Sequence, residues 1–229
     1  MLLRGIALTF SVWLIALILL TSAPVVRGQR VVDKIVATVS DRVRTELITL
    51  SDLKWQLALQ PNTSIEPPSS DDLNRALRLL IDQRLFTLEA ERLPREAPDK
   101  AEINAKIGEI VSYFPSAAEF ERRLKVVGFK SVSDPNFEQL ISERIAIDKY
   151  LDFRFRSFIV ITAEDESKYY RDVFVPDFRR RNVGVIVPSQ ESKRSEIISA
   201  LTEERVAQQI ETFLDEAKRR AEIVILSPV

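Results

Sequence analysis

The 229-residue chain contains no cysteine, no histidine and only five glycines. Without cysteine it can carry neither a disulfide nor an acylated N-terminal cysteine. Without histidine it lacks the commonest general base, the commonest zinc ligand and the usual switch near physiological pH. The glycines stand far apart, at positions 5, 28, 108, 128 and 184, which excludes the glycine-rich loops that hold phosphates. Carboxylate, serine, tyrosine or lysine chemistry stays open, but no motif points to it, so we expect no enzyme: no catalytic residue, no cofactor and no metal.

The composition is that of a globular protein with a weakly acidic surface. Hydrophobic residues make up 45% of the chain and charged residues 29%, so we expect a packed core. The net charge is −1, and it becomes about −3 if Arg4 and Arg27 leave with a signal peptide. Nucleic-acid binding needs a basic face for the phosphates, so this charge argues against a nucleic-acid partner.

Residues 1–28 are typical of an export signal. A short positive segment is followed by an apolar run over residues 5–20 and then by small residues up to Gly28, where we expect cleavage. The alternative is an uncleaved membrane anchor, since 22 uncharged residues separate Arg4 from Arg27, enough to span a bilayer. Either alternative places the rest of the chain outside the cytoplasm.

Short apolar segments at the two ends of the mature chain predict β-strands. Residues 31–39 and 46–50 flank a polar loop at 40–45, which indicates a hairpin. Residues 222–226, with the sequence EIVIL, predict a third strand near the C-terminus. Nearly everything between these ends predicts helix, so the third strand should pair with the first. We therefore predict a mainly α fold with a small sheet formed by the N-terminal hairpin and the C-terminal strand.

Apolar residues spaced three and four apart predict helices over most of the remaining chain. Proline, glycine and capping residues mark their ends. Pro176, Gly184 and Pro188 interrupt residues 175–192, which we interpret as a connector. The predicted helices cover residues 51–60, capped by Ser51 and Asp52; residues 72–93, 100–113, 117–127 and 134–155; a helix that begins after Thr162; and residues 202–221.

Several of these segments, in this order, resemble SurA-type periplasmic chaperones. VVDKIVATVSDR, LLIDQRLFTLEAERL and FPSAAEFERRLKVVGF look like the N-terminal region of that family. ERIAIDKYLDFRFRSFIVITAEDESKYYRDVF is similar to its bridge into a first parvulin prolyl-isomerase domain. AKRRAEIVIL resembles the closing helix and strand that return to complete the N-terminal core. The resemblance covers most of the mature chain, residues 29–229.

The resemblance implies a helical chaperone domain that holds unfolded proteins bound for the outer membrane, in the periplasm and without ATP. One departure is large: residues 175–192 stand where the family carries one or two parvulin domains of roughly a hundred residues each. The catalytic histidines of such a domain cannot exist in this chain, so isomerase activity is not implied. The partners implied are unfolded or extended polypeptides, and a homodimer that exchanges elements stays open. An envelope assembly subunit that holds one folded partner is the alternative function.

Aromatic residues between positions 150 and 178 are the candidate client-binding surface. Phe153 and Phe155 are two positions apart on a predicted helix and cannot share a face, so burial of one predicts that the other lies near the surface or under another element. The alternative is that these rings pack in the core. The candidate client-binding residues are Phe153, Phe155, Phe158, Tyr169, Tyr170 and Phe174.

Clusters of like charge have simpler explanations than chemistry. Residues 179–181 are three arginines, and such a triplet is most often a solvated or ion-paired surface. The acidic residues 71–72 and 164–166 stand at predicted helix starts, where carboxylates cap the helix and complement its dipole. Trp55, among leucines on a short predicted helix, is expected to anchor the core.

Overall fold

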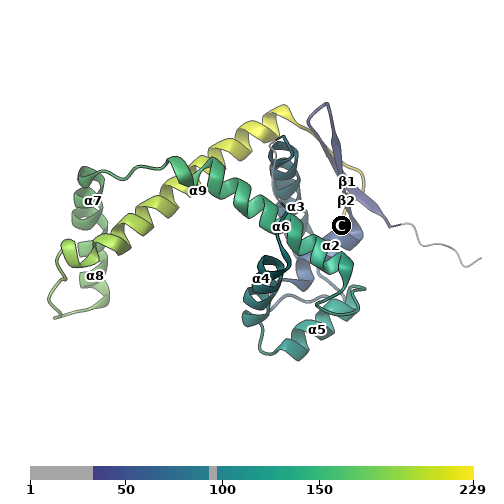
Figure 1. The fold of residues 1–229 in the computed structure, drawn as a ribbon, viewed down its shortest axis with the longest axis horizontal. Helices are drawn as coiled ribbons and strands as arrows, with labels where there is room; N and C mark the ends of the chain where they lie inside the picture. Colours follow the sequence, from purple (N-terminus) through teal and green to yellow (C-terminus); the bar gives the residue numbers. More distant parts are fainter. Residues whose placement is uncertain (1–32, 93–96) are drawn as a thin grey trace, which may run out of the picture. The chain divides into compact units, whose positions relative to one another are not determined.

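The computed structural model describes residues 33–92 and 97–229. They form a mainly α-helical fold with one small antiparallel sheet, as the sequence predicts (Figure 1). The predicted signal or anchor, residues 1–28, lies outside the described residues. Among the described helices, none has both the length and the apolar character that crossing a membrane requires.

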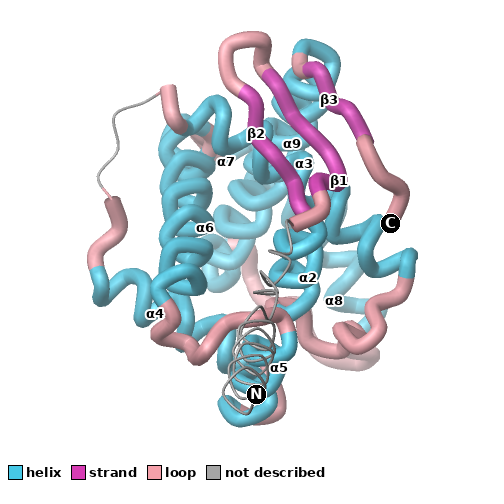
Figure 2. The backbone as a smooth tube through the Cα atoms, turned by 90° about the vertical axis from the view of Figure 1, so that its right-hand side faces the viewer, coloured by secondary structure: helices cyan, strands magenta, loops and turns pink. Residues whose placement is uncertain are grey.

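The sheet joins the two ends of the described chain, and its strand order is β2-β1-β3 (Figure 2). β1 (Ile35–Ser40) forms the predicted hairpin with β2 (Thr45–Thr49), and β3 (Glu222–Ile225) pairs antiparallel with the other edge of β1. The predicted pairing of the terminal strands is therefore confirmed. The predicted start of the first strand at residue 31 is wrong, because Asp33 and Lys34 lie outside the ladder and Asp33 Oδ1 accepts from the Ser51 amide at 3.3 Å.

The first two helices begin earlier than the sequence predicts. α2 (Leu50–Ala58) is capped by Thr49, and Asp52 lies three positions on, completing a reciprocal capping box; Ser51 and Asp52 are therefore not the cap. α3 (Ser70–Ala90) is capped by the Ser69 hydroxyl. In both helices a hydroxyl one turn upstream accepts the free amide, and the predicted acidic residues fill the first turn.

The next three helices closely follow their predicted bounds. They are α4 (Lys100–Ser112), α5 (Ala117–Val126) and α6 (Pro135–Arg154). Gly128 follows α5 with a φ of +101°, a backbone conformation that a glycine adopts without a Cβ clash. Asp134 caps α6 and leaves a proline at its first position, as predicted.

The last third of the chain is more helical than predicted. A single 3-10 turn, η1 (Arg156–Phe158), leads to α7 (Ala163–Tyr169), a π-helical turn η2 (Tyr170–Phe174) and α8 (Val175–Arg181). The connector prediction for residues 175–192 is thus wrong over α8. Pro176 cannot donate to a residue four earlier and crowds that carbonyl. The wide π turn directly before it accommodates such a defect within a continuing helix.

The final helix, α9 (Arg194–Arg220), follows a short 3-10 turn, η3 (Glu191–Lys193), and begins eight residues before its predicted start at Thr202. Ile197 is buried and holds this extra part of the helix against its neighbours. α9 then leads directly into β3, which places the C-terminal strand beside β1 (Figure 1).

Three groups of buried side chains form the core. The first joins the sheet to α2, α3 and the end of α9, and the second lies among α2, α4, α5 and α6. The third is small and joins α3 and the C-terminal part of α6 to the middle of α9, around Phe86, Tyr150, Phe155 and Val206. The candidate site lies over this third group.

Candidate functional site

The six predicted client-binding residues have three different environments. Phe155 is buried, at 3% exposed, whereas Phe153 is 57% and Phe158 71% exposed. Tyr169, Tyr170 and Phe174 are half-buried, in the segment of α7 and η2. Of the two expected positions for the ring opposite a buried Phe155, near the surface or under another element, Phe153 takes the first.

Phe155 belongs to the core and drops out of the candidate surface. Its ring meets Phe213 edge-on at 5.6 Å and Tyr150 at 6.4 Å between centroids. α6 ends directly before it, and its amide donates to the Leu151 carbonyl. The chain therefore turns its Phe155 side chain inward while Phe153 and Phe158 stay outside.

A groove runs between the end of α6, η1 and the middle of α9. We call it the α6–α9 groove; it has a volume of about 620 Å³. Phe158 lines the groove, and the exposed Phe153 ring lies against it with ring centroids 6.2 Å apart; Val160 is also exposed. Its lining residues are Arg154, Phe155, Phe158, Gln208, Gln209, Thr212, Phe213 and Glu216.

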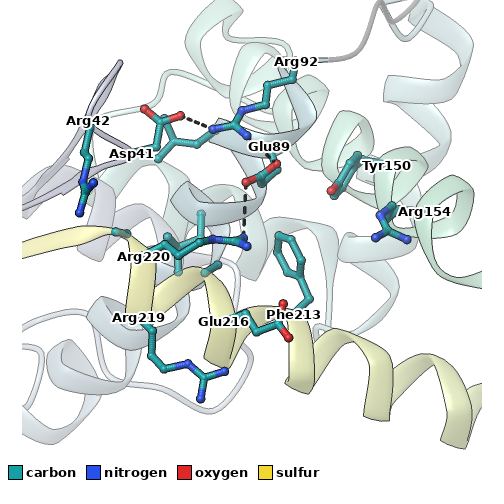
Figure 3. A pocket seen from close by; sticks show the side chains of 14 residues that line it. Asp41, Arg42, Glu89, Arg92, Tyr150, Arg154, Phe213, Glu216, Arg219 and Arg220 are labelled. Carbon is teal, nitrogen blue, oxygen red and sulfur yellow. Dashed lines mark hydrogen bonds and ion pairs between the residues drawn. The ribbon is translucent and has the colours of Figure 1, made fainter.

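A second hollow, which we call the arginine pocket, continues from the groove. It has a volume of about 690 Å³ and shares Arg154, Phe213 and Glu216 with the groove. The β1–β2 loop, the C-terminal part of α3, the end of α6 and the end of α9 line it (Figure 3). Its arginines are Arg42, Arg92, Arg154, Arg219 and Arg220, and its carboxylates are Asp41, Glu89 and Glu216.

Ion pairs connect the walls of the arginine pocket. Arg92 lies 2.8 Å from Asp41 and 3.3 Å from Glu89, and Arg220 approaches Glu89 at 3.9 Å (Figure 3). The backbone amides of Arg44 and Val43 donate to Asp41, and together with the Arg92 guanidinium they lower the pKa of its carboxyl to about 2. The hairpin loop is thereby fixed to the end of α3.

The half-buried aromatic residues of the α7–α8 segment stack on one another. Tyr170 and Phe174 lie 5.6 Å apart and nearly parallel, and Phe178 continues the stack at 5.8 Å. The Tyr170 hydroxyl donates to the Pro188 carbonyl at 2.7 Å and so holds the following loop against the stack. These rings therefore stabilise their own segment as well as presenting an edge to solvent.

The loop between α8 and η3 exposes apolar side chains that the sequence analysis did not select. Val183 is 89% and Ile186 90% exposed, and Val185 is exposed between them. The signal was present in the sequence as VGVIV, residues 183–187, an apolar run inside the segment interpreted as a connector. An apolar run at an exposed loop marks an interaction surface more often than an isolated apolar residue does.

The predicted structural roles of the charge clusters are confirmed. Asp165 completes a capping box with Thr162, and hydrogen bonds from Thr162 and from Arg205 lower the pKa of its carboxyl to about 2. Arg180 and Arg181 both pair with Asp177. In residues 33–92 and 97–229, no group of three or more acidic side chains is placed to hold a metal ion.

Trp55 packs its ring 5.0 Å from Phe129, and its indole N–H donates to the Val127 carbonyl at 3.1 Å, in agreement with the predicted anchoring role. Neither the groove nor the arginine pocket was predicted from the sequence, because the walls of each come from segments that are far apart in the chain: residues 154–158 and 208–216 for the groove, and residues 41–42 to 219–221 for the pocket.

Fold and surfaces together define a mainly α-helical domain, closed by a terminal sheet, with an aromatic groove that opens into a cationic pocket. Neither a comparison with protein-family models nor a comparison with curated protein sequences finds a match for this chain.

Proposed function

We propose that this protein is an ATP-independent, non-enzymatic holdase of the periplasm that binds unfolded or extended polypeptides on their way to the outer membrane. The observation that carries the proposal is the α6–α9 groove, an open hollow lined by the exposed Phe158 ring, against which the exposed Phe153 ring lies. The resemblance of the sequence segments to SurA-type chaperones agrees with it. The candidate client surface is Phe153 and Phe158 together with the edges of Tyr169, Tyr170 and Phe174.

Loose binding follows from the size of these surfaces. A ring half-covered by a client removes little apolar area from water, and each contact contributes on the order of 1 kcal/mol. Several such contacts along one extended chain give useful retention through multivalency. Each breaks independently, so release needs no nucleotide.

Isomerase activity is not part of the proposal. Between α7 and α9 the chain has room only for η2, α8 and a short loop, and the sequence contains no histidine. A prolyl-isomerase assay with a proline-containing peptide should give the uncatalysed rate.

The test is suppression of aggregation. The purified chain from residue 29 onward is mixed, without ATP, with a β-barrel membrane protein diluted from denaturant, and light scattering is followed. We expect suppression at near-stoichiometric ratios. Undiminished aggregation across a wide range of ratios would contradict the proposal.

Two matched variants test whether the exposed rings of Phe153 and Phe158 bind the client. Phe153→Ala with Phe158→Ala removes both exposed rings and should weaken suppression several-fold with little change in thermal stability, because exposed side chains contribute little to folding. Tyr113→Ala removes an exposed aromatic residue that directly follows α4 and lines neither hollow, and it should behave like the unmodified chain.

An envelope assembly subunit with one folded partner is the second candidate. The exposed run of Val183, Val185 and Ile186 favours it, because a compact apolar projection suits a single preformed pocket. Pull-down from envelope extract separates the two: one stoichiometric partner supports the assembly role, and a mixture of unfolded outer-membrane proteins supports the holdase.

A further inference from the structure

The arginine pocket has a charge opposite to that of the chain. Five arginines and three carboxylates line it, a net charge of +2, whereas the whole chain has a net charge of −1. Concentrating cations in a hollow of a weakly acidic protein raises the local potential there and favours anionic ligands.

Two of the five arginines form ion pairs with carboxylates of the pocket, and three can bind a ligand. Arg92 and Arg220 pair with Asp41 and Glu89. Among the described residues, no carboxylate lies within ion-pairing distance of the other three arginines, which are Arg42, Arg154 and Arg219. Arg154 instead places its guanidinium 5.5 Å from the centre of the Phe155 ring, which holds it at the junction with the groove.

The pocket also offers apolar surface beside these cations. Leu85, Leu88, Phe213 and Ala217 line it, and three of the four belong to the buried core. A ligand that fits both parts carries anionic groups next to an apolar side chain.

We propose that the arginine pocket selects acidic segments of extended polypeptides, binding two or more side-chain carboxylates through Arg42, Arg154 and Arg219 while a neighbouring apolar side chain rests against Phe213. This deepens the proposed holdase function and rests on it.

The placement of the three arginines favours an extended chain over one small anion. They come from the hairpin loop, α6 and α9, and Figure 3 shows them on different sides of the pocket. A single carboxylate is too small to meet all three. Because the pocket shares Arg154, Phe213 and Glu216 with the α6–α9 groove, a chain can run from one into the other.

The contacts are exposed ion pairs, so the preference is modest and sensitive to salt. Each exposed pair changes affinity by roughly two- to fivefold, and three together give roughly tenfold or more at low salt. At high ionic strength the charges are screened and the preference should largely disappear.

The experiment compares two labelled peptides by fluorescence anisotropy with the chain from residue 29 onward. One alternates glutamate with phenylalanine and alanine, and the other replaces each glutamate by glutamine. The acidic peptide should bind roughly tenfold more tightly at low salt. Equal affinities for the two peptides would overturn the proposal.

Two charge-matched triple variants assign the effect to the pocket. R42Q/R154Q/R219Q should lose the preference for the acidic peptide. R75Q/R78Q/R122Q removes three arginines that line neither hollow and should keep it. A preference that survives in the pocket variant, or is lost equally in both, contradicts the assignment, and circular dichroism of each variant confirms that it is folded.

Two further measurements distinguish peptide binding from lipid binding and test the holdase function separately. Flotation with vesicles of anionic phospholipid tests a membrane surface: vesicle binding that needs the pocket arginines, without a peptide preference, would assign the pocket to lipid and overturn the proposal. Aggregation suppression is measured on the same samples with an uncharged client. If the unmodified chain suppresses aggregation but does not prefer the acidic peptide, only the pocket proposal is rejected. If the unmodified chain does not suppress aggregation, the holdase function is rejected as well.

Discussion

Arg123 is a buried cation whose partners are backbone carbonyls. It lies on α5, is 6% exposed, and its guanidinium donates to the carbonyls of Leu57, Ala58, Gln60 and Thr63 at 2.8–3.2 Å. These carbonyls belong to the end of α2 and the loop after it, where helix carbonyls lack intrahelical donors and the helix dipole is negative. Burial lowers the pKa of Arg123 from its usual range. One side chain thus donates hydrogen bonds to two carbonyls of α2 and two of the loop after it.

Arg123→Met should destabilise the protein by about 3 kcal/mol, because it removes four hydrogen bonds to backbone carbonyls, two of which are buried. Urea unfolding followed by circular dichroism measures the change. Arg122→Met is the matched control: Arg122 is the adjacent residue of the same helix, its side chain is 58% exposed, and it pairs only with Glu119. An exposed pair of this kind contributes less than about 1 kcal/mol. Equal effects of the two substitutions would show that the carbonyl contacts contribute nothing.

The C-terminal segment acts at the scale of an element, because it completes a sheet that begins at the other end of the chain. β3 pairs with β1, and the amides of Leu226 and Ser227 both donate to the Val36 carbonyl. The Ile223 and Val229 side chains pack against the core group that contains the hairpin. β1 is therefore a central strand only while β3 is present.

Deleting residues 222–229 should unfold the hairpin region along with the deleted strand. Amide hydrogen exchange over residues 35–40 should accelerate strongly, since two strands alone are marginal in water. Ile225→Thr is the control, because this exposed side chain lies on the same strand and threonine suits a strand well. Unchanged protection of β1 in the deletion variant would show that the hairpin is held by the helices alone.

At the scale of the whole molecule, the missing histidine and the lowered pKa values of several carboxyls, most of all Asp41 and Asp165, shape the response to acid. No side chain has its ordinary pKa between about 5 and 8, so stability should be nearly constant across that range. Asp41 and Asp165, with an ordinary value of 3.8, have a pKa of about 2 in the folded protein. The folded state therefore favours their ionised forms, and this stabilisation is present above about pH 4 and lost as the pH falls to about 2.

The urea midpoint should accordingly be similar at pH 7 and pH 5 and then fall between about pH 4 and pH 2. In the variant Asp41→Asn with Asp165→Asn the midpoint should be lower at pH 7 and should change less over the acid range. Measured midpoints at pH 7, 5, 4, 3 and 2 test this. A profile for the variant that runs parallel to that of the unmodified chain would contradict the assigned role of these two carboxylates.

Local features were the part of the structure that could be predicted. Helix caps at Asp134 and Thr162, the stop at Gly128 and the alternation of the terminal strands all act within a few residues, so a short window of sequence contains their cause. The predictions that were wrong concern segments where tertiary packing decides. Residues 175–181 are helical because a π turn accommodates the proline there, and α9 begins early because Ile197 is buried.

The sequence by itself determined a mainly α fold and the hairpin, because hydrophobic periodicity and capping are local properties. It also indicated the pairing of the two terminal strands, because nearly everything between them predicts helix and the third strand then has the hairpin as its partner. It also predicted that Phe153 and Phe155 cannot share one face. Only the tertiary structure decided which of the two is buried, since that depends on where Phe213 of α9 packs. The groove and the arginine pocket also depend on the tertiary structure. In the pocket, residues 41, 92, 154 and 219 meet only when the hairpin, α3, α6 and α9 pack together.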